Sequence, residues 1–146
     1  MKRVAFDFDG TLDNFFGGGW NTMKEDVRKF CKKLISLPNV EVYIITRRFD
    51  KLHQSLINDE PEHTIVYKLA EKLGVSKENV FFTNREWKKD KVEELKIDIH
   101  LDDDSEDCKH INESGKNCIA VCLDKKYNPE EKNWETYIHE LLNIKE

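Results

Sequence analysis

The 146-residue chain is predicted to be an α/β protein in which helices cover both faces of a parallel sheet of about five strands. Two patterns predict this three-layer, Rossmann-like class. Short apolar runs that suit buried strands alternate along the chain with longer segments of helical periodicity, and such alternation is typical of parallel sheets. Polar residues also gather directly after several apolar runs, where ligands bind in folds of this class.

Each element of this fold can be placed from local patterns. Short apolar runs predict strands at residues 4–8, 40–45, 80–82, 97–101 and 118–123. Periodic segments predict helices at residues 21–35, 49–57, 64–73, 87–95, 104–113 and 134–142. In the first helix Met23, Val27 and Phe30 recur at near-helical spacing, and Gly74 follows the third as a residue that commonly ends helices. No repeat or long linker interrupts the order, so we expect one domain over residues 1–146.

The composition indicates a water-soluble globular protein. Hydrophobic residues make up 38% of the chain and charged residues 36%, a balance that argues against disorder. The net charge of -5 disfavours a broad nucleic-acid surface but leaves room for a local basic groove. No apolar run approaches the ~20 residues that cross a bilayer, and no signal-peptide pattern opens the chain. We therefore expect a cytoplasmic protein with no membrane contact, whose four cysteines are reduced structural thiols.

The strongest chemical signal is the segment Asp7-Phe8-Asp9-Gly10-Thr11, which continues from the first apolar run. Two carboxylates two residues apart at a strand end can reach a common point. Crowded carboxylates repel one another and favour a bound cation, and Mg²⁺ prefers oxygen ligands. A carboxylate can also attack phosphorus, while a second one supplies a proton to the leaving group. Gly10 would permit an unusual backbone turn.

Further polar residues follow two other predicted strands. Thr46, Arg47 and Arg48 come directly after the second strand, and Asp102 and Asp103 after the fourth. A hydroxyl at Thr46 can hydrogen-bond a phosphoryl group, and a guanidinium can grip phosphate oxygens through two hydrogen bonds. Because the carboxyl ends of parallel strands meet at one edge, we expect these side chains to converge with the first acidic pair.

In this order the segments resemble the haloacid dehalogenase superfamily of phosphatases over nearly the whole chain. The resemblance implies that Asp7 is the nucleophile and that Asp9 is first the general acid and then the base, its backbone carbonyl helping to hold Mg²⁺. It implies that Thr46 contacts the transferring phosphoryl group. It also implies that Asp102, Asp103 or both bind Mg²⁺, directly or through water.

The resemblance further implies a lysine that neutralises the nucleophile and the phosphate. The candidates are Lys88, Lys89, Lys91 and Lys96. The spacing before the next strand favours Lys91, with Lys89 as the second choice.

The substrate is expected to be a nucleotide or a phosphorylated nucleic-acid end. The lengths between the motifs leave no room for a separate cap domain, as in minimal relatives such as polynucleotide 3′-phosphatases. Residues 13–20 contain three glycines and the aromatic Trp20, and could form a flap that contacts a base. Residues 124–129, followed by Trp134, are weakly similar to 5′(3′)-deoxyribonucleotidases. Sugar phosphates and phosphoproteins are the alternative substrates.

Two other classes fit parts of the pattern. A receiver-type phospho-acceptor domain combines the same residue types, but it carries its acidic pair after the first strand and its acceptor after the third. A non-catalytic binding module on the same fold would have lost Asp7, Asp9 or the lysine, and none is missing. The sequence therefore predicts a Mg²⁺-dependent phosphomonoester hydrolase, without an obligate protein partner.

Overall fold

The computed structural model describes residues 1–13, 22–49, 62–114, 117–123 and 133–143. Strands and helices alternate along these residues as predicted. The elements are β1 (Lys2–Phe6), α1 (Thr22–Ile35), β2 (Val40–Thr46), α2 (Glu62–Leu73), the short 3₁₀ helix η1 (Lys77–Asn79), β3 (Val80–Phe82), α3 (Lys89–Glu94), β4 (Ile99–Asp102), α4 (Ser105–Glu113), β5 (Ile119–Cys122) and α5 (Trp134–Leu142). The predicted helix at residues 49–57 lies almost wholly outside the described residues.

The five strands form one parallel sheet in the order β3-β2-β1-β4-β5, with β1 at its centre. This is the strand order of the first five strands of a Rossmann fold, which confirms the predicted class. Phe6, the last residue of β1, is in register with Ile44 of β2 and Leu101 of β4. The carboxyl ends of β1, β2 and β4 therefore lie together at one edge of the sheet.

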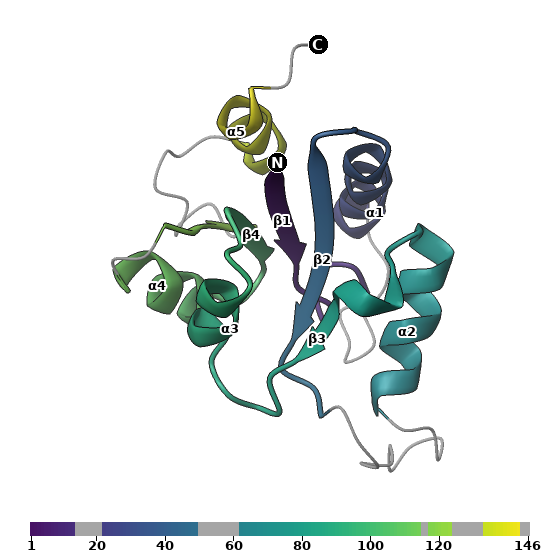
Figure 1. The fold of residues 1–146 in the computed structure, drawn as a ribbon, viewed down its shortest axis with the longest axis vertical. Helices are drawn as coiled ribbons and strands as arrows, with labels where there is room; N and C mark the ends of the chain where they lie inside the picture. The colour runs from purple at the N-terminus through teal and green to yellow at the C-terminus, as the bar shows by residue number, and fades with distance from the viewer. Residues whose placement is uncertain (14–21, 50–61, 115–116, 124–132, 144–146) are drawn as a thin grey trace.

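Helices cover both faces of the sheet (Figure 1). On one face Val4, Phe6 and Ile44 pack in a core cluster with apolar residues of α1, α2 and α5. On the other face Ala5 and Ile45 pack with apolar residues of α3 and α4. Successive side chains of a strand point to opposite faces, so strands buried on both sides are nearly continuous apolar runs, with the buried His100 and Asp102 of β4 as exceptions.

The first strand is shorter than its apolar run suggested, and ends at Phe6 instead of residue 8. The Asp7 amide still donates to the Leu101 carbonyl of β4, at 2.9 Å. Beyond it the Phe8 carbonyl accepts hydrogen bonds from the amides of residues 11, 12 and 13. The chain thus turns back on itself directly after Asp7, and the apolar Phe8, although beyond the strand, is buried in the core cluster that contains Val4 and Phe6.

No separate cap domain covers the sheet edge within the part of the chain that the structure describes, in agreement with the motif spacing. Among the helices in that part, none combines the length and apolar character needed to cross a membrane. Trp20 and most of the predicted flap lie outside the described residues, as do residues 124–129.

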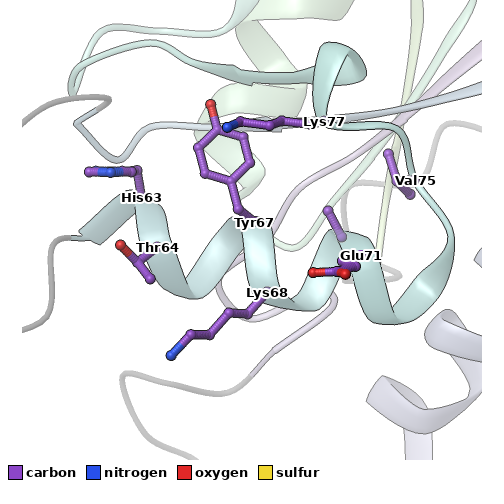
Figure 2. Close-up of a pocket in the computed structure, with 8 residues that line it drawn as sticks. His63, Thr64, Tyr67, Lys68, Glu71, Val75 and Lys77 are labelled. Carbon is purple, nitrogen blue, oxygen red and sulfur yellow. The ribbon is translucent and has the colours of Figure 1, made fainter.

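A groove of about 650 Å³ runs beside α2 (Figure 2). Its lining includes His63, Tyr67, Lys68, Glu71 and Lys77. None of the residues that line it belongs to the polar segments at the carboxyl ends of β1, β2 and β4. The groove is therefore separate from the edge where the predicted site residues gather.

Candidate active site

The turn after β1 brings a hydrogen-bond donor to the side chain of Asp7. Its side chain is buried, and the Thr11 hydroxyl donates to its Oδ2 atom at 3.1 Å. Gly10 makes this turn possible, since its φ of +80° is one that L side chains rarely adopt. A Cβ atom at Gly10 would also overlap the Asp103 carboxylate. Gly10 therefore brings the turn and the second acidic segment into direct contact.

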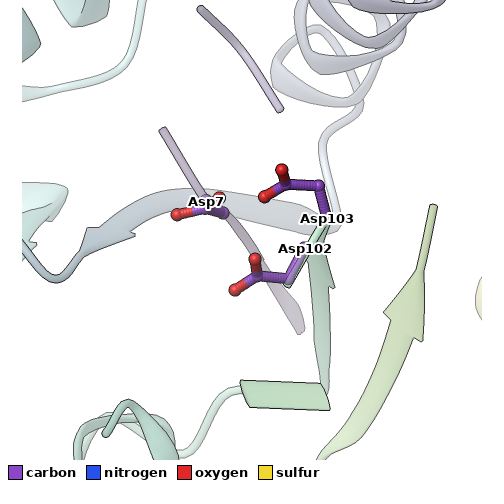
Figure 3. A group of neighbouring side chains, drawn as sticks. All are labelled: Asp7, Asp102 and Asp103. Carbon is purple, nitrogen blue, oxygen red and sulfur yellow. The ribbon is translucent and has the colours of Figure 1, made fainter. Parts of the chain in front are cut away.

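Three carboxylates from two strand ends converge here (Figure 3). Asp7 follows β1, Asp102 is the last residue of β4, and Asp103 comes directly after it. One oxygen from each lies within 4.8 Å of the others. Burial raises the pKa of Asp7 well above its usual value, and the negative charge of Asp102 adds to the rise. An all-oxygen set of crowded acids fits a hard divalent cation such as Mg²⁺, which would relieve this repulsion.

Lys88 lies at the centre of the acidic cluster and is only 1% exposed. Its Nζ atom is 2.5 Å from Asp7 Oδ1 and 2.7 Å from Asp102 Oδ2. Burial alone would lower the pKa of Lys88, but the carboxylates of Asp102 and Asp7 outweigh burial and raise it. Lys88 therefore stays charged and bridges the two strand ends.

Neither Lys91, the lysine that the spacing favoured, nor Lys89, the second choice, is the lysine that contacts Asp7 and Asp102 in the structure. Lys91 forms a surface ion pair with Glu94 at 2.7 Å. The structure brings Lys88 to the cluster instead, because α3 begins at Lys89 and Lys88 precedes its first turn. The backbone amide of Lys88 donates to the buried Asp107 of α4 at 3.1 Å. This hydrogen bond joins residues far apart in the sequence, so the spacing of the neighbouring lysines could not predict it.

His100 and Asp107 contact residues of the cluster and were not among the predicted site residues. His100 is fully buried, and its Nε2 atom lies 2.8 Å from Asp102 Oδ2. Burial alone would raise the pKa of Asp102, but Lys88 and the His100 contact hold it well below its usual range. The period of two along β4, which puts His100 and Asp102 on one face, was the available signal.

The two arginines after β2 have different surroundings. Arg48 is 1% exposed and binds Asp9 through two hydrogen bonds, Nε to Oδ2 at 2.9 Å and Nη2 to Oδ1 at 2.7 Å. Arg47 lies near the surface, with its guanidinium 4.5 Å from the centre of the Trp87 ring and 3.7 Å from Asp104. Thr46, at the end of β2, is buried and its hydroxyl accepts from the Arg48 amide at 3.2 Å.

Asp7, Thr11, Asp102 and Asp103 are thus gathered in one cluster, while Asp9 faces Arg48 two residues beyond Asp7. No protein-family model matches this chain, and a search of curated proteins finds no similar sequence. Membership of the haloacid dehalogenase superfamily accordingly stays a prediction from the motifs and their order.

Proposed function

We propose that this protein is a Mg²⁺-dependent phosphomonoester hydrolase of the haloacid dehalogenase type, with Asp7 as its nucleophile. One observation carries the proposal: a buried lysine bridges the carboxylates that follow the central strand and its neighbour. Lys88 contacts both Asp7 and Asp102. A charged lysine in a buried acidic cluster is suited to stabilise the extra negative charge that a phosphate brings.

The first chemical step is an in-line attack by Asp7. One of its carboxylate oxygens forms a bond to phosphorus while the bond between phosphorus and the alcohol oxygen breaks. Thr11 and Lys88 each engage one oxygen of Asp7, so the carboxylate is oriented before the substrate arrives. Asp9 donates a proton to the departing alkoxide, and the product of the step is an aspartyl phosphate at Asp7.

In the second step water hydrolyses the aspartyl phosphate. Asp9, now deprotonated, takes a proton from the water, which attacks phosphorus, and the bond to Asp7 breaks with release of inorganic phosphate. Bound Mg²⁺ would neutralise charge on the transferring phosphoryl group, held by Asp7, Asp102, Asp103 and the Asp9 carbonyl. Lys88 keeps its charge throughout and balances the carboxylates on both strand ends.

The receiver alternative is less well supported by the described residues. Receiver domains have the strand order 2-1-3-4-5, whereas the order here is β3-β2-β1-β4-β5. A receiver also needs its acceptor aspartate after the third strand, and here β3 ends at Phe82 with Thr83 next. A nucleophile after the central strand suits a phosphatase better.

A nucleotide or phosphorylated nucleic-acid end remains the proposed substrate class. Two rim residues support it: Arg47, with a side chain 34% exposed, and Trp87, which is 39% exposed and adjoins Lys88 in sequence. A guanidinium can bind a phosphate. The Trp87 ring stacks on His110 at 4.3 Å and lies 4.5 Å from the Arg47 guanidinium, so it would offer a base its exposed edge and not a ring face. Sugar phosphates and phosphoproteins are the competing substrates.

Hydrolysis of an aryl phosphate tests the proposed activity. We expect turnover with Mg²⁺, its loss in EDTA and its recovery when Mg²⁺ is added back. Asp7→Asn should reduce turnover at least about 10³-fold, a loss of roughly 4 kcal/mol of transition-state stabilisation. Asp90→Asn, at an exposed position on α3, is the matched control and should keep full activity. Full activity of Asp7→Asn, or activity that survives EDTA, would contradict the proposal.

A further inference from the structure

The pairing of Arg48 with Asp9 is a feature that the phosphatase chemistry by itself does not require. Asp9 is the group proposed to move the proton, and its two carboxylate oxygens both accept hydrogen bonds from one guanidinium. Such a two-point contact fixes the plane of the carboxylate as well as its position. A single point charge, such as a lysine ammonium, would leave the carboxylate free to rotate.

Arg48 is itself held from several directions. Its amide donates to the Thr46 hydroxyl, and its carbonyl accepts from the Asn84 amide at 3.2 Å. Its guanidinium lies 4.9 Å from the centre of the Phe8 ring. A buried guanidinium that lost its carboxylate partner would pay a large desolvation cost. The pair is therefore a stable part of the fold.

Arg48 and Asp9 differ in the solvent exposure of their side chains. The side chain of Arg48 is 1% exposed, whereas that of Asp9 is 29% exposed. The carboxylate thus keeps an accessible side while the arginine behind it is buried. A substrate approaching from solvent would meet Asp9 before Arg48.

We propose that Arg48 is a positioning residue for Asp9 and does not bind the substrate phosphate. This inference rests on the proposed function and revises the expectation that both arginines grip phosphate. Arg48 would hold the Asp9 carboxyl group where its protonated form can give a proton to the leaving oxygen and its carboxylate form can later take one from water. Small displacements of a proton-transfer group are costly, and a shift of about 1 Å can lower the rate 10²-fold.

The test separates positioning from phosphate binding by three measurements on Arg48→Met. We expect kcat for an alkyl phosphate to fall about 10- to 100-fold. The inhibition constant of inorganic phosphate should change less than about twofold, because phosphate binding does not use Arg48. Arg48→Met should cost less than about a further twofold when Asp9 is already Asn, because its effect passes through Asp9.

Arg47→Met is the matched control, because it removes the neighbouring guanidinium without touching the pair. When Arg47→Met and Asp9→Asn are combined, the loss of kcat should equal the product of the two single losses. Arg48→Lys keeps the charge but not the two-point contact, so it should recover less than half of the kcat that Arg48→Met loses. If Arg48→Met does not fold, Arg48→Lys takes its place in the test. Any of three results would overturn the inference. They are an unchanged kcat in the Arg48 variant, a phosphate inhibition constant raised about tenfold or more, and a loss of kcat in the double variant with Asp9→Asn that equals the product of the two single losses. An inactive wild-type protein would instead overturn the proposed function, and the inference with it.

Discussion

Replacement of Lys88 by methionine is the most informative perturbation of this protein. The change keeps an unbranched side chain, one atom shorter, and removes the ammonium that lies 2.5 Å from Asp7 and 2.7 Å from Asp102. Removing one partner of a buried ion pair costs at least about 3 kcal/mol, because the remaining charges are left uncompensated. For a chain of this size each kcal/mol lowers Tm by roughly 2–4 °C, so Tm should fall by about 6–12 °C.

Lys91→Met provides the matched control. Lys91 pairs with Glu94 on the surface, and exposed pairs of this kind contribute at most about 1 kcal/mol. Its Tm should change by less than about 4 °C. Phosphatase activity should also distinguish the two variants: Lys88→Met should lose about 10²- to 10³-fold, and Lys91→Met should keep full activity.

Thermal unfolding followed by circular dichroism, with and without Mg²⁺, measures the effect on stability. Added Mg²⁺ should recover part of the Tm lost in Lys88→Met, because a cation on Asp7, Asp102 and Asp103 supplies some of the missing positive charge. The reasoning fails if Lys88→Met unfolds like the wild type and keeps its activity, or if Lys91→Met shows the larger losses.

Three further predictions concern the same site. Gly10→Ala should lower both stability and Mg²⁺ affinity by displacing the Asp103 carboxylate. Gly74→Ala, also at positive φ but with a Cβ atom that would make only ordinary van der Waals contact with Ile35, should lower stability alone, and metal titration separates the two variants. Asp9→Asn should slow hydrolysis of alkyl phosphates more than that of aryl phosphates, whose leaving groups need less help from an acid; equal losses would count against the acid role. The raised pKa of Lys88 implies stabilisation that is complete below its ordinary pKa of 10.5 and is lost as pH rises above that value. In urea unfolding, the stability difference between the wild type and Lys88→Met should therefore shrink above about pH 10.5, and a constant difference would refute the assignment.

Much of the fold could be predicted from the sequence because its signals are local and redundant. The apolar runs of β2 and β3 and the periodic spacing in α1 each needed only neighbouring residues. The cap of α4 is local too: the Asp104 side chain accepts from the amides of residues 106 and 107. Strand ends were less certain, and β1 stopped short of Phe8 because a turn competes there for the backbone hydrogen bonds.

The sequence by itself also determined which segments supply the acidic cluster. Asp102 and Asp103 follow an apolar run that predicted a buried strand, and Asp7 lies near the end of another. Because the carboxyl ends of parallel strands share an edge, the gathering of these carboxylates at that edge follows from strand direction. That β1 and β4 are neighbours in the sheet, which brings the carboxylates close together, was decided by the tertiary structure.

Tertiary structure alone decided the partners of the charged side chains. Four lysines between residues 88 and 96 are equivalent by composition and nearly so by spacing. Lys88 is selected because Asp107, on a different helix, anchors its backbone amide just before α3 begins. Arg48 likewise turns to Asp9, 39 residues away in sequence. A buried charge is tolerated only where an opposite charge lies within a few ångströms, and that distance is set by the packing of elements far apart in the chain.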